Sequence, residues 1–431
     1  MVGLFLVLLI LATLYEDNEI LLIIHIMITK SDFLVTIKEQ NITRRVVFMA
    51  FNVIGANLRR IRESKGFTQE HVATLSGLSR PAYRNIETGD SMPKVSTLQN
   101  IAAGLGVRLE DLVSPVRTLE HVRFRALKRM KSRDQILTDV ARWLEDFDYL
   151  EDLLDDKISY KVGGLARQLA AVPQGASRAR QAAQSARKEM GLAPKEPIRD
   201  TAGLLESRGI KLYPFILASD DFFGLSVSTQ DGGPAIVVNV WERIAVERWI
   251  FSAAHELGHL LLHLEAYQVD ETQEDEEHEH EANIFASHFL MPDDAFEPEW
   301  SETYGLAFVD RVLKVKRIFQ VSYKTVLYRL SEGYGSSVWE RFQVGFKSRT
   351  GRTLRVMDEP EALLPCSFHQ SMSEVLRSQE PDSLSASDFV EDRLSKLVRL
   401  AIEREDITLS RGAEVLRLDL DTMRDRVASW E

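Results

Sequence analysis

The chain has 431 residues, of which 45% are hydrophobic and 27% are charged, a composition typical of a soluble protein with room for two or three cored domains. Its net charge of −12 is unevenly spread, because basic residues gather at 117–133 and acidic ones at 145–156 and 270–281. The single cysteine, Cys366, excludes an intramolecular disulfide and a multi-cysteine zinc site, and it fits a reducing cytoplasm.

Residues 1–48 differ in character from the rest of the chain. Two apolar runs, Val2–Leu14 and Ile20–Ile28, fall short of the roughly 20 residues that span a bilayer. The first run also lacks the positive charge that precedes the apolar core of a signal peptide. We therefore expect no stable membrane association and interpret this segment as a spurious or disordered extension, with Met49 as the natural start. A weak membrane anchor is the alternative.

The segment 51–115 has the pattern of short amphipathic helices. Thr68 and Ser79 offer hydroxyl N-caps, and Gly77 marks a tight turn between the two helices that they begin. Two helices joined by such a turn form a helix-turn-helix. The predicted helices of this domain are Ile54–Ser64, Thr68–Ser76, Ser79–Glu87, Lys94–Leu105 and Leu109–Leu112.

Three parts of this domain, Thr68–Ala73, Gly77–Gly89 and Pro93–Leu98, resemble the Xre, or phage-repressor, type of helix-turn-helix. The resemblance implies a five-helix domain whose third helix enters the major groove of double-stranded DNA, and it makes a homodimer on a two-fold site the expected form. The residues that it places on DNA are Ser79, Arg80, Tyr83 and Arg84, at base edges or phosphates, and Gln69, at a phosphate. A protein-binding module that pairs with a like fold is the alternative.

The next region, 116–175, is charged and is predicted to form a helical connector. After it come two further helices, at Gly175–Met190 and Ile198–Arg208, and then β character. The predicted strands are Ile210–Phe215, Gly224–Ser228 and Ala235–Asn239. We therefore expect a mainly α-helical chain with one small sheet, of the α+β class.

An apolar stretch then contains two histidines at helical spacing. On an α-helix, His255 and His259 project from one face, so both imidazoles can reach one metal ion at about 2.0–2.1 Å. Glu256, between them, is placed to take a proton from an activated water molecule. A catalytic zinc site needs a third protein ligand, and the next cluster of carboxylates and histidines lies at 277–292.

The sequence HELGHLLLH from His255, the pattern E-x-x-A-N-x-F-A from Glu279 and the L-M-P that ends at Pro292 resemble the ImmA/IrrE family of bacterial metallopeptidases. The resemblance runs from about Ala182 to Pro292. It implies a zincin-like domain that binds Zn²⁺ through His255, His259 and Glu279, with Glu281 as the alternative third ligand. It also implies that the edge strand of the sheet binds an extended substrate, and that the substrate is a repressor protein, often of the Xre type.

The peptidase domain is accordingly placed at 176–332. Near its end, Leu313–Leu330 resembles a second helix-turn-helix, which we interpret as a substrate-docking or packing element. Residues 333–431 are predicted to form a helical C-terminal region.

Together these predictions describe a cytoplasmic, DNA-binding transcriptional regulator fused to a zinc-dependent endopeptidase. Two alternatives stay open. In one, the zincin-like domain is a non-catalytic sensor or dimerisation module of a transcription factor. In the other, the helix-turn-helix is the docking arm of a peptidase.

Overall fold

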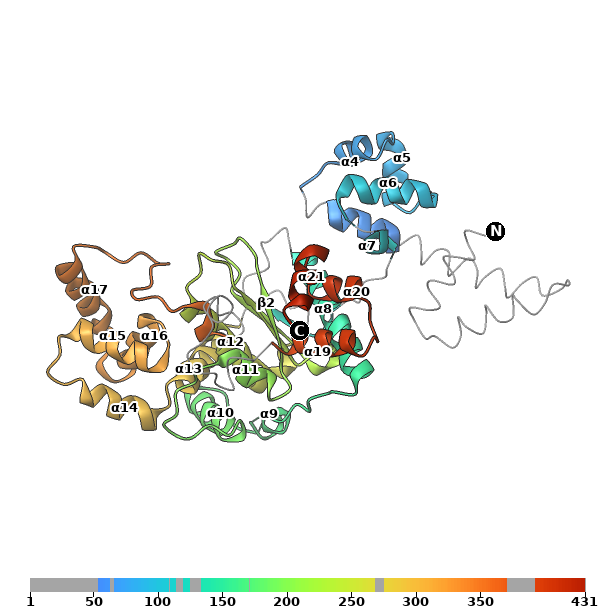
Figure 1. Cartoon of the computed structure of the whole chain (residues 1–431). Helices are drawn as coiled ribbons and strands as arrows, with labels where there is room; N and C mark the ends of the chain where they lie inside the picture. The colour runs from blue at the N-terminus through green and yellow to red at the C-terminus, as the bar shows by residue number, and fades with distance from the viewer. Residues whose placement is uncertain are drawn as a thin grey trace. The chain divides into compact units, whose positions relative to one another are not determined.

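The protein is described from a computed structural model. The structure describes residues 53–62, 66–107, 109–113, 119–124, 133–169, 171–267, 275–369 and 392–430. The chain divides into two compact units, Met1–Arg117 and Thr118–Glu431 (Figure 1). The interpretation of residues 1–48 lies outside the described residues, and the finer domain boundaries within the second unit stay predictions.

The first unit is helical throughout its described residues. A helix at residues 53–62 is followed by α4 (Gln69–Leu75), α5 (Arg80–Glu87), α6 (Val95–Leu105) and α7 (Leu109–Val113). The hydroxyl of Thr68 accepts a hydrogen bond from the N–H of His71 at 3.1 Å, and that of Ser79 accepts one from Ala82 at 3.3 Å. Gly77, between the two helices, has a φ of +69°, which only glycine adopts without strain. The predicted helix-turn-helix is confirmed.

A buried ion pair ties the first helix of this unit to α5. Arg62 donates to both carboxylate oxygens of Glu87, at 2.7 and 2.8 Å. The two helices approach closely, since a Cβ on Gly55 would lie 2.6 Å from the carbonyl oxygen of Glu87. The orientation of α5 is therefore fixed from its C-terminal end as well as by the apolar core.

The second unit contains a four-stranded sheet in the order β1-β3-β4-β2. Its strands are β1 (Val122–Phe124), β2 (Lys211–Phe215), β3 (Gly224–Val227) and β4 (Ala235–Asn239). β1 and β4 both run antiparallel to β3, whereas β2 runs parallel to β4. The three strands β2, β3 and β4 confirm the predicted ones. β1 was not predicted, and its place at the edge of β3 corrects the expectation that this part of the connector is helical.

Along the sequence, one group of helices lies between β1 and β2, and a second group follows β4. Those between β1 and β2 are α8 (Arg133–Leu154), α9 (Gly163–Leu169), α10 (Ala176–Glu189) and α11 (Thr201–Glu206). Those that follow are α12 (Val246–Leu262), α13 (Glu276–Leu290), α14 (Asp293–Glu302), α15 (Phe308–Phe319), α16 (Tyr323–Tyr334) and α17 (Ser337–Thr350). The last three are α19 (Arg393–Glu403), α20 (Leu409–Val415) and α21 (Leu420–Ala428), and α19 packs on α8 (Figure 1). The predicted mainly α fold with a small sheet is confirmed.

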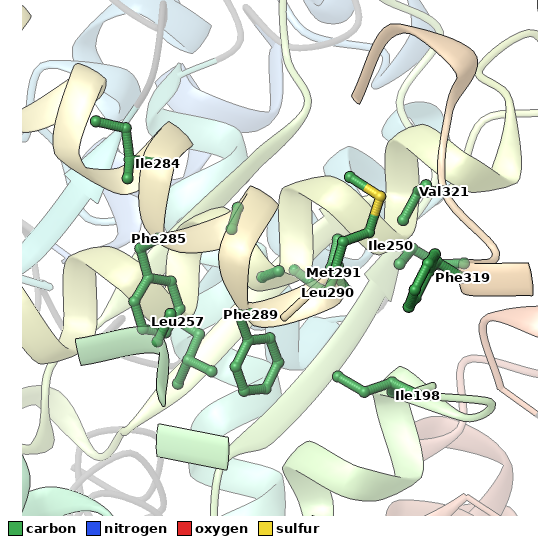
Figure 2. Packing of buried hydrophobic residues seen from close by; sticks show 14 of the residues in the cluster. Ile198, Ile250, Leu257, Ile284, Phe285, Phe289, Leu290, Met291, Phe319 and Val321 are labelled. Atoms are coloured by element: carbon green, nitrogen blue, oxygen red, sulfur yellow. The ribbon is translucent and has the colours of Figure 1, made fainter. Parts of the chain in front are cut away.

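The core of the second unit is centred on the contact between α12 and α13. Figure 2 shows Leu257 of α12 beside Phe285 and Phe289 of α13, and all three side chains are fully buried. The two helices meet closely at Gly258, where an added Cβ would lie 2.9 Å from Cδ1 of Phe285. A glycine in a helix interior costs up to about 1 kcal/mol relative to alanine, so its presence here reflects the space that the Phe285 ring needs.

Among the described residues, no helix combines the length and the apolar character needed to cross a membrane.

The close approach at Gly258 makes a stability prediction. Gly258→Ala places a methyl group against the buried ring of Phe285, and overpacking of this kind costs about 1–3 kcal/mol. We expect a lower midpoint of thermal unfolding. Gly333→Ala in α16 is the matched control, since its Cβ meets nothing within 4 Å. It should leave the midpoint unchanged or raise it. Equal midpoints for the two variants would contradict the packing argument.

Candidate metal centre

Two buried histidines of α12 lie at the centre of the candidate site. His255 and His259 are 2% and 1% exposed, and their Nε2 atoms are 2.9 Å apart. The helical spacing of four residues places both rings on one face, as the sequence predicts. Burial holds the pKa of His259 well below its usual value, so that its imidazole is neutral and has a lone pair to offer a cation.

Glu279 reaches these histidines from the first turns of α13. Its Oε2 lies 3.3 Å from Nε2 of His255, and its Oε1 lies 3.2 Å from Nε2 of His259. Burial opposes the ionisation of Glu279, but its close contacts with the two histidines outweigh burial and hold the pKa of the carboxyl far below its usual range. The carboxylate therefore faces the histidines in its charged form.

The three side chains fit a metal ion in donor type and in spacing. Among the described residues, His255, His259 and Glu279 form the group whose ligand atoms all lie within 4.8 Å of one another. Ligands bound to a tetrahedral ion at 2.0–2.1 Å are about 3.3–3.4 Å apart, close to the observed 2.9, 3.2 and 3.3 Å. Two nitrogens and one carboxylate are also the donor set of catalytic zinc sites that keep one open position.

A hydrogen bond from α13 orients the first histidine. Nδ1 of His255 lies 3.1 Å from the side-chain oxygen of Asn283. An amide oxygen can only accept, so Nδ1 carries the proton and Nε2 is left unprotonated toward the cluster. Asn283 stands one helical turn after Glu279, and α13 therefore supplies both a candidate ligand and the group that sets the tautomer of another.

A buried chain of side chains orients the second histidine. Nδ1 of His259 lies 2.9 Å from Nδ1 of His263, and Nε2 of His263 lies 2.9 Å from Oε2 of Glu281. Arg178 of α10 donates to both carboxylate oxygens of Glu281. Although burial opposes it, the bonds from His263 and Arg178 lower the pKa of Glu281 to about 2. Glu281 thus holds His263 instead of joining the cluster, which corrects its place as the alternative third ligand.

Glu256 points from α12 onto strand β3. Its Oε2 accepts a hydrogen bond from the hydroxyl of Ser226 at 2.7 Å, and that hydroxyl lies 2.7 Å from the buried hydroxyl of Tyr267. A Cβ on Gly224 would lie 3.4 Å from Cγ of Glu256. Burial raises the pKa of the Tyr267 phenol well above its usual value, so this hydroxyl stays protonated and available as a donor.

A cavity of about 700 Å³ is lined by two neighbours of His255, although the three candidate ligands themselves do not line it. Its lining includes Asn283 and Phe251, both of which contact His255: the amide binds Nδ1, and the ring of Phe251 lies 6.3 Å from the imidazole, centroid to centroid. Phe223, which directly precedes β3, also lines it. Space for a ligand therefore adjoins the candidate metal centre.

The residues predicted to contact DNA divide into two groups. Ser79, Arg80 and Arg84 are exposed on α5. Gln69 is partly buried, and its amide donates to Glu87 at 3.0 Å. Tyr83 is fully buried in the core, where burial and the nearby charge of Glu87 raise the pKa of its phenol. The expectation that Tyr83 faces a base edge is therefore wrong.

Several residues around the centre were not predicted to take part. The sequence pattern gave no role to Ser226, Tyr267, Arg178 or His263. Of these only His263 carried a signal, because it follows His259 by four residues and so lies on the same face of the helix.

The hydrogen-bond chain predicts that His263 supports the affinity of the centre. Loss of a residue that orients a metal ligand typically weakens metal binding 10- to 100-fold. We expect His263→Ala to weaken Zn²⁺ binding by about this factor, measured by competition with a chromophoric chelator. His280→Ala is the matched control, since His280 is exposed on α13, and it should bind as the wild type does. Unchanged affinity in both variants would contradict this role.

Comparison with known proteins gives the same two parts. A model of helix-turn-helix domains matches residues 58–112, and a model of the IrrE N-terminal-like domain, a peptidase family, matches residues 206–331. An uncharacterized HTH-type transcriptional regulator, y4dJ of Sinorhizobium fredii strain NGR234, is 41% identical over 63 residues, which are 15% of this chain and 82% of that protein.

Two further relatives match this chain over less than half of their own length. The HTH-type transcriptional regulator SutR of Escherichia coli K12 is 32% identical over 14% of this chain and 35% of its own. The uncharacterized regulator YqaE of Bacillus subtilis strain 168 is 40% identical over 13% of this chain and 49% of its own. The chain belongs to the helix-turn-helix transcriptional regulators and carries, in its second unit, an IrrE-like domain of the metallopeptidase type.

Proposed function

We propose that the chain is a cytoplasmic, DNA-binding regulator whose second unit is a zinc-dependent endopeptidase that cleaves a repressor-type protein. The observation that carries this proposal is the convergence of His255, His259 and Glu279 beside a buried carboxylate, Glu256. A bare binding site would need only the three ligands. The fourth group, held against β3 by Ser226, is what hydrolysis requires in addition.

The donor set fits Zn²⁺, which supplies Lewis-acid activation of a water molecule and of the scissile carbonyl. Proton transfer and the orientation of the side chains are the roles of the protein's own residues. Glu256 accepts the proton of the attacking water and passes it to the leaving amine. Ser226 fixes Oε2 of Glu256 by donating to it, and Tyr267 holds Ser226 in turn. Asn283 and His263 keep the two histidines in the tautomers that present Nε2.

The cavity beside His255 supports a peptide as the substrate. It is lined by aromatic rings, among them Phe223 and Phe251, and by charged side chains of both signs, such as Arg248 and Glu359. A mixed lining of this kind suits a side chain of a protein substrate. The alternative, a zincin-like domain that only senses metal or holds a dimer, needs neither this cavity nor the buried Glu256.

The DNA-binding half of the proposal rests on α5. Arg80 and Arg84 stand one turn apart on its exposed side, next to the N-terminal Ser79. Among the described residues, Arg80 pairs loosely with Glu70 at 3.9 Å, and both side chains are more than half exposed. Such a pair contributes little, so the guanidinium can turn to a phosphate or a guanine.

The catalytic half predicts a separation of zinc binding from hydrolysis. Glu256→Gln removes the base but keeps the shape, so cleavage of a repressor-type substrate should fall by about 10²–10⁴-fold while zinc content stays at the wild-type level. Cleavage is followed by gel electrophoresis and zinc by mass spectrometry. Glu277→Gln, on an exposed residue of α13, is the control and should cleave normally. Full cleavage by Glu256→Gln would contradict the role of Glu256 as the base, whereas zinc-loaded wild type that cleaves nothing would favour the non-catalytic sensor.

The DNA-binding part of the proposal predicts that Arg80 and Arg84 each contribute to DNA affinity, whereas a lysine of equal charge elsewhere on the surface does not. Loss of one phosphate contact should reduce the slope of log K against log salt by about one, and loss of a base contact should cost about 1–3 kcal/mol. We expect one of these effects for each of Arg80→Ala and Arg84→Ala, measured by fluorescence anisotropy on operator DNA. Lys94→Ala removes the same charge from an exposed position before α6 and should bind like the wild type. Wild-type binding by all three variants would favour a docking arm for proteins.

A further inference from the structure

The outer edge of β3 is occupied by a segment of the same chain. β1 pairs with β3 in antiparallel register, with Val122 opposite Val227, Arg123 opposite Ser226 and Phe124 opposite Leu225. The N–H of Ser228 extends the pairing by donating to the carbonyl of His121 at 3.0 Å. The side chain of Val122 is only 2% exposed. In sequence, this segment lies between the last helix of the first unit, α7, and the first helix of the second, α8.

β3 is also the strand that holds the candidate catalytic base, Glu256 of α12, in place. Ser226 donates to Glu256 from this strand, and the backbone at Gly224 approaches the same carboxylate. An extended peptide binds a sheet by adding a strand to an exposed edge, where backbone hydrogen bonds give the affinity. A peptide that entered along β3 would lie beside Glu256. In this structure that edge is taken by β1.

Arg123 brings a positive charge from β1 to the metal centre. Its guanidinium lies 3.6 Å from Oε1 of Glu279 and 3.4 Å from Nδ1 of His278. The side chain is only 11% exposed. Oε1 of Glu279 is the atom that faces His259 at 3.2 Å. A cation that enters the cluster would therefore share this carboxylate with a guanidinium already beside it, and two like charges at this distance repel.

A purely protective role explains part of this arrangement. Sheet edges are commonly covered by a short strand, because an open edge pairs with other chains. Protection, however, does not require a buried arginine aimed at a candidate metal ligand. Within the described residues, β1 pairs with β3 at three positions, a short ladder that a longer substrate strand can replace. Both features suit an occupant that leaves.

We propose that Val122–Phe124 is a built-in inhibitory strand: it occupies the edge of β3 on which an extended segment of the substrate protein docks, and its Arg123 masks Glu279. The substrate displaces β1 by adding its own strand to β3, and Arg123 leaves the metal ligand with it. The identity of the displacing partner rests on the proposed peptidase function. The masking of Glu279 by Arg123 does not.

The test uses the full-length protein and two variants of β1. Arg123→Ala removes the mask and keeps the strand. Val122→Asp places a charge at a buried position and so detaches the strand from β3. Arg243→Ala is the control of equal charge, on an exposed residue that stacks on Trp241. Three quantities are measured: zinc affinity by chelator competition, hydrogen exchange of the amides in 122–124 and 224–227, and cleavage of β-casein as an unfolded probe.

We expect Arg123→Ala to raise zinc affinity roughly tenfold, because the like charge beside Glu279 is removed. Val122→Asp should raise zinc affinity likewise, speed exchange in both segments and increase casein cleavage several-fold. The control should match the wild type. Lower zinc affinity in Arg123→Ala would overturn the proposal, because Arg123 would then position Glu279 instead of masking it.

The other outcomes separate this inference from the proposed function. If no variant cleaves casein but zinc affinity and exchange change as expected, the peptidase function fails and the masking strand stands. If Val122→Asp loosens the strand but cleaves no faster than the wild type, the inhibitory strand fails and the peptidase stands. Self-cleavage of the zinc-loaded wild type between residues 119 and 133 would show that the segment is a substrate, which also overturns the inhibitory role.

Discussion

The close packing of α12 on α13 at Gly258 is the constraint on which the candidate metal centre depends. With no side chain at this position, the ring of Phe285 can lie against the helix backbone. Phe285 is six residues after Glu279 on α13, and Gly258 directly precedes His259 on α12. The distance between the helix axes therefore sets how far Glu279 must reach to the two histidines. A larger side chain at Gly258 would separate the helices where the three candidate ligands meet.

The buried polar groups in this interface are stabilised by ion pairs and hydrogen bonds with one another. An isolated buried carboxylate or imidazolium is costly, and burial alone would shift its pKa until it became neutral. Here Glu281 is held charged by Arg178 and His263, and Glu279 by His255 and His259. Such networks are strongly destabilised when one partner is lost. The same contacts that orient the histidines for a cation thus contribute to the packing of α10, α12 and α13.

Sequence reasoning was most reliable where the structure is local. The two histidines share a helical face whatever the rest of the chain does, and the N-caps Thr68 and Ser79 follow from their own residues and turn. The choice between Glu279 and Glu281 was different. Residues two positions apart on a helix point about 200° apart, so Glu279 and Glu281 cannot both reach His255 and His259. The rotation of α13 that decides between them is set by contacts such as Gly258 with Phe285.

Long-range pairing was the part that the sequence could not reveal. β1 has three residues, and its partner β3 begins about a hundred residues later in the sequence. Its neighbours at 117–133 are rich in basic residues, and this composition favoured a solvated helix. Tyr83 was misjudged for a related reason. Its ring packs into the core together with Ile86, which follows it by about one helical turn. The family resemblance assigned DNA contacts along the helix without showing which of its positions are buried.

The geometry of a β-strand explains how one short strand serves both the base and an occupant of its edge. Side chains of a strand project above and below the sheet, while its backbone N–H and C=O groups lie in the plane of the sheet. Ser226 can therefore hold Glu256 with its hydroxyl while the backbone of β3 pairs with a neighbour. Any strand on that edge, whether β1 or a foreign peptide, necessarily lies beside Glu256. An open strand edge pairs readily with other chains unless a segment covers it, and in this chain Val122–Phe124 covers the edge of β3.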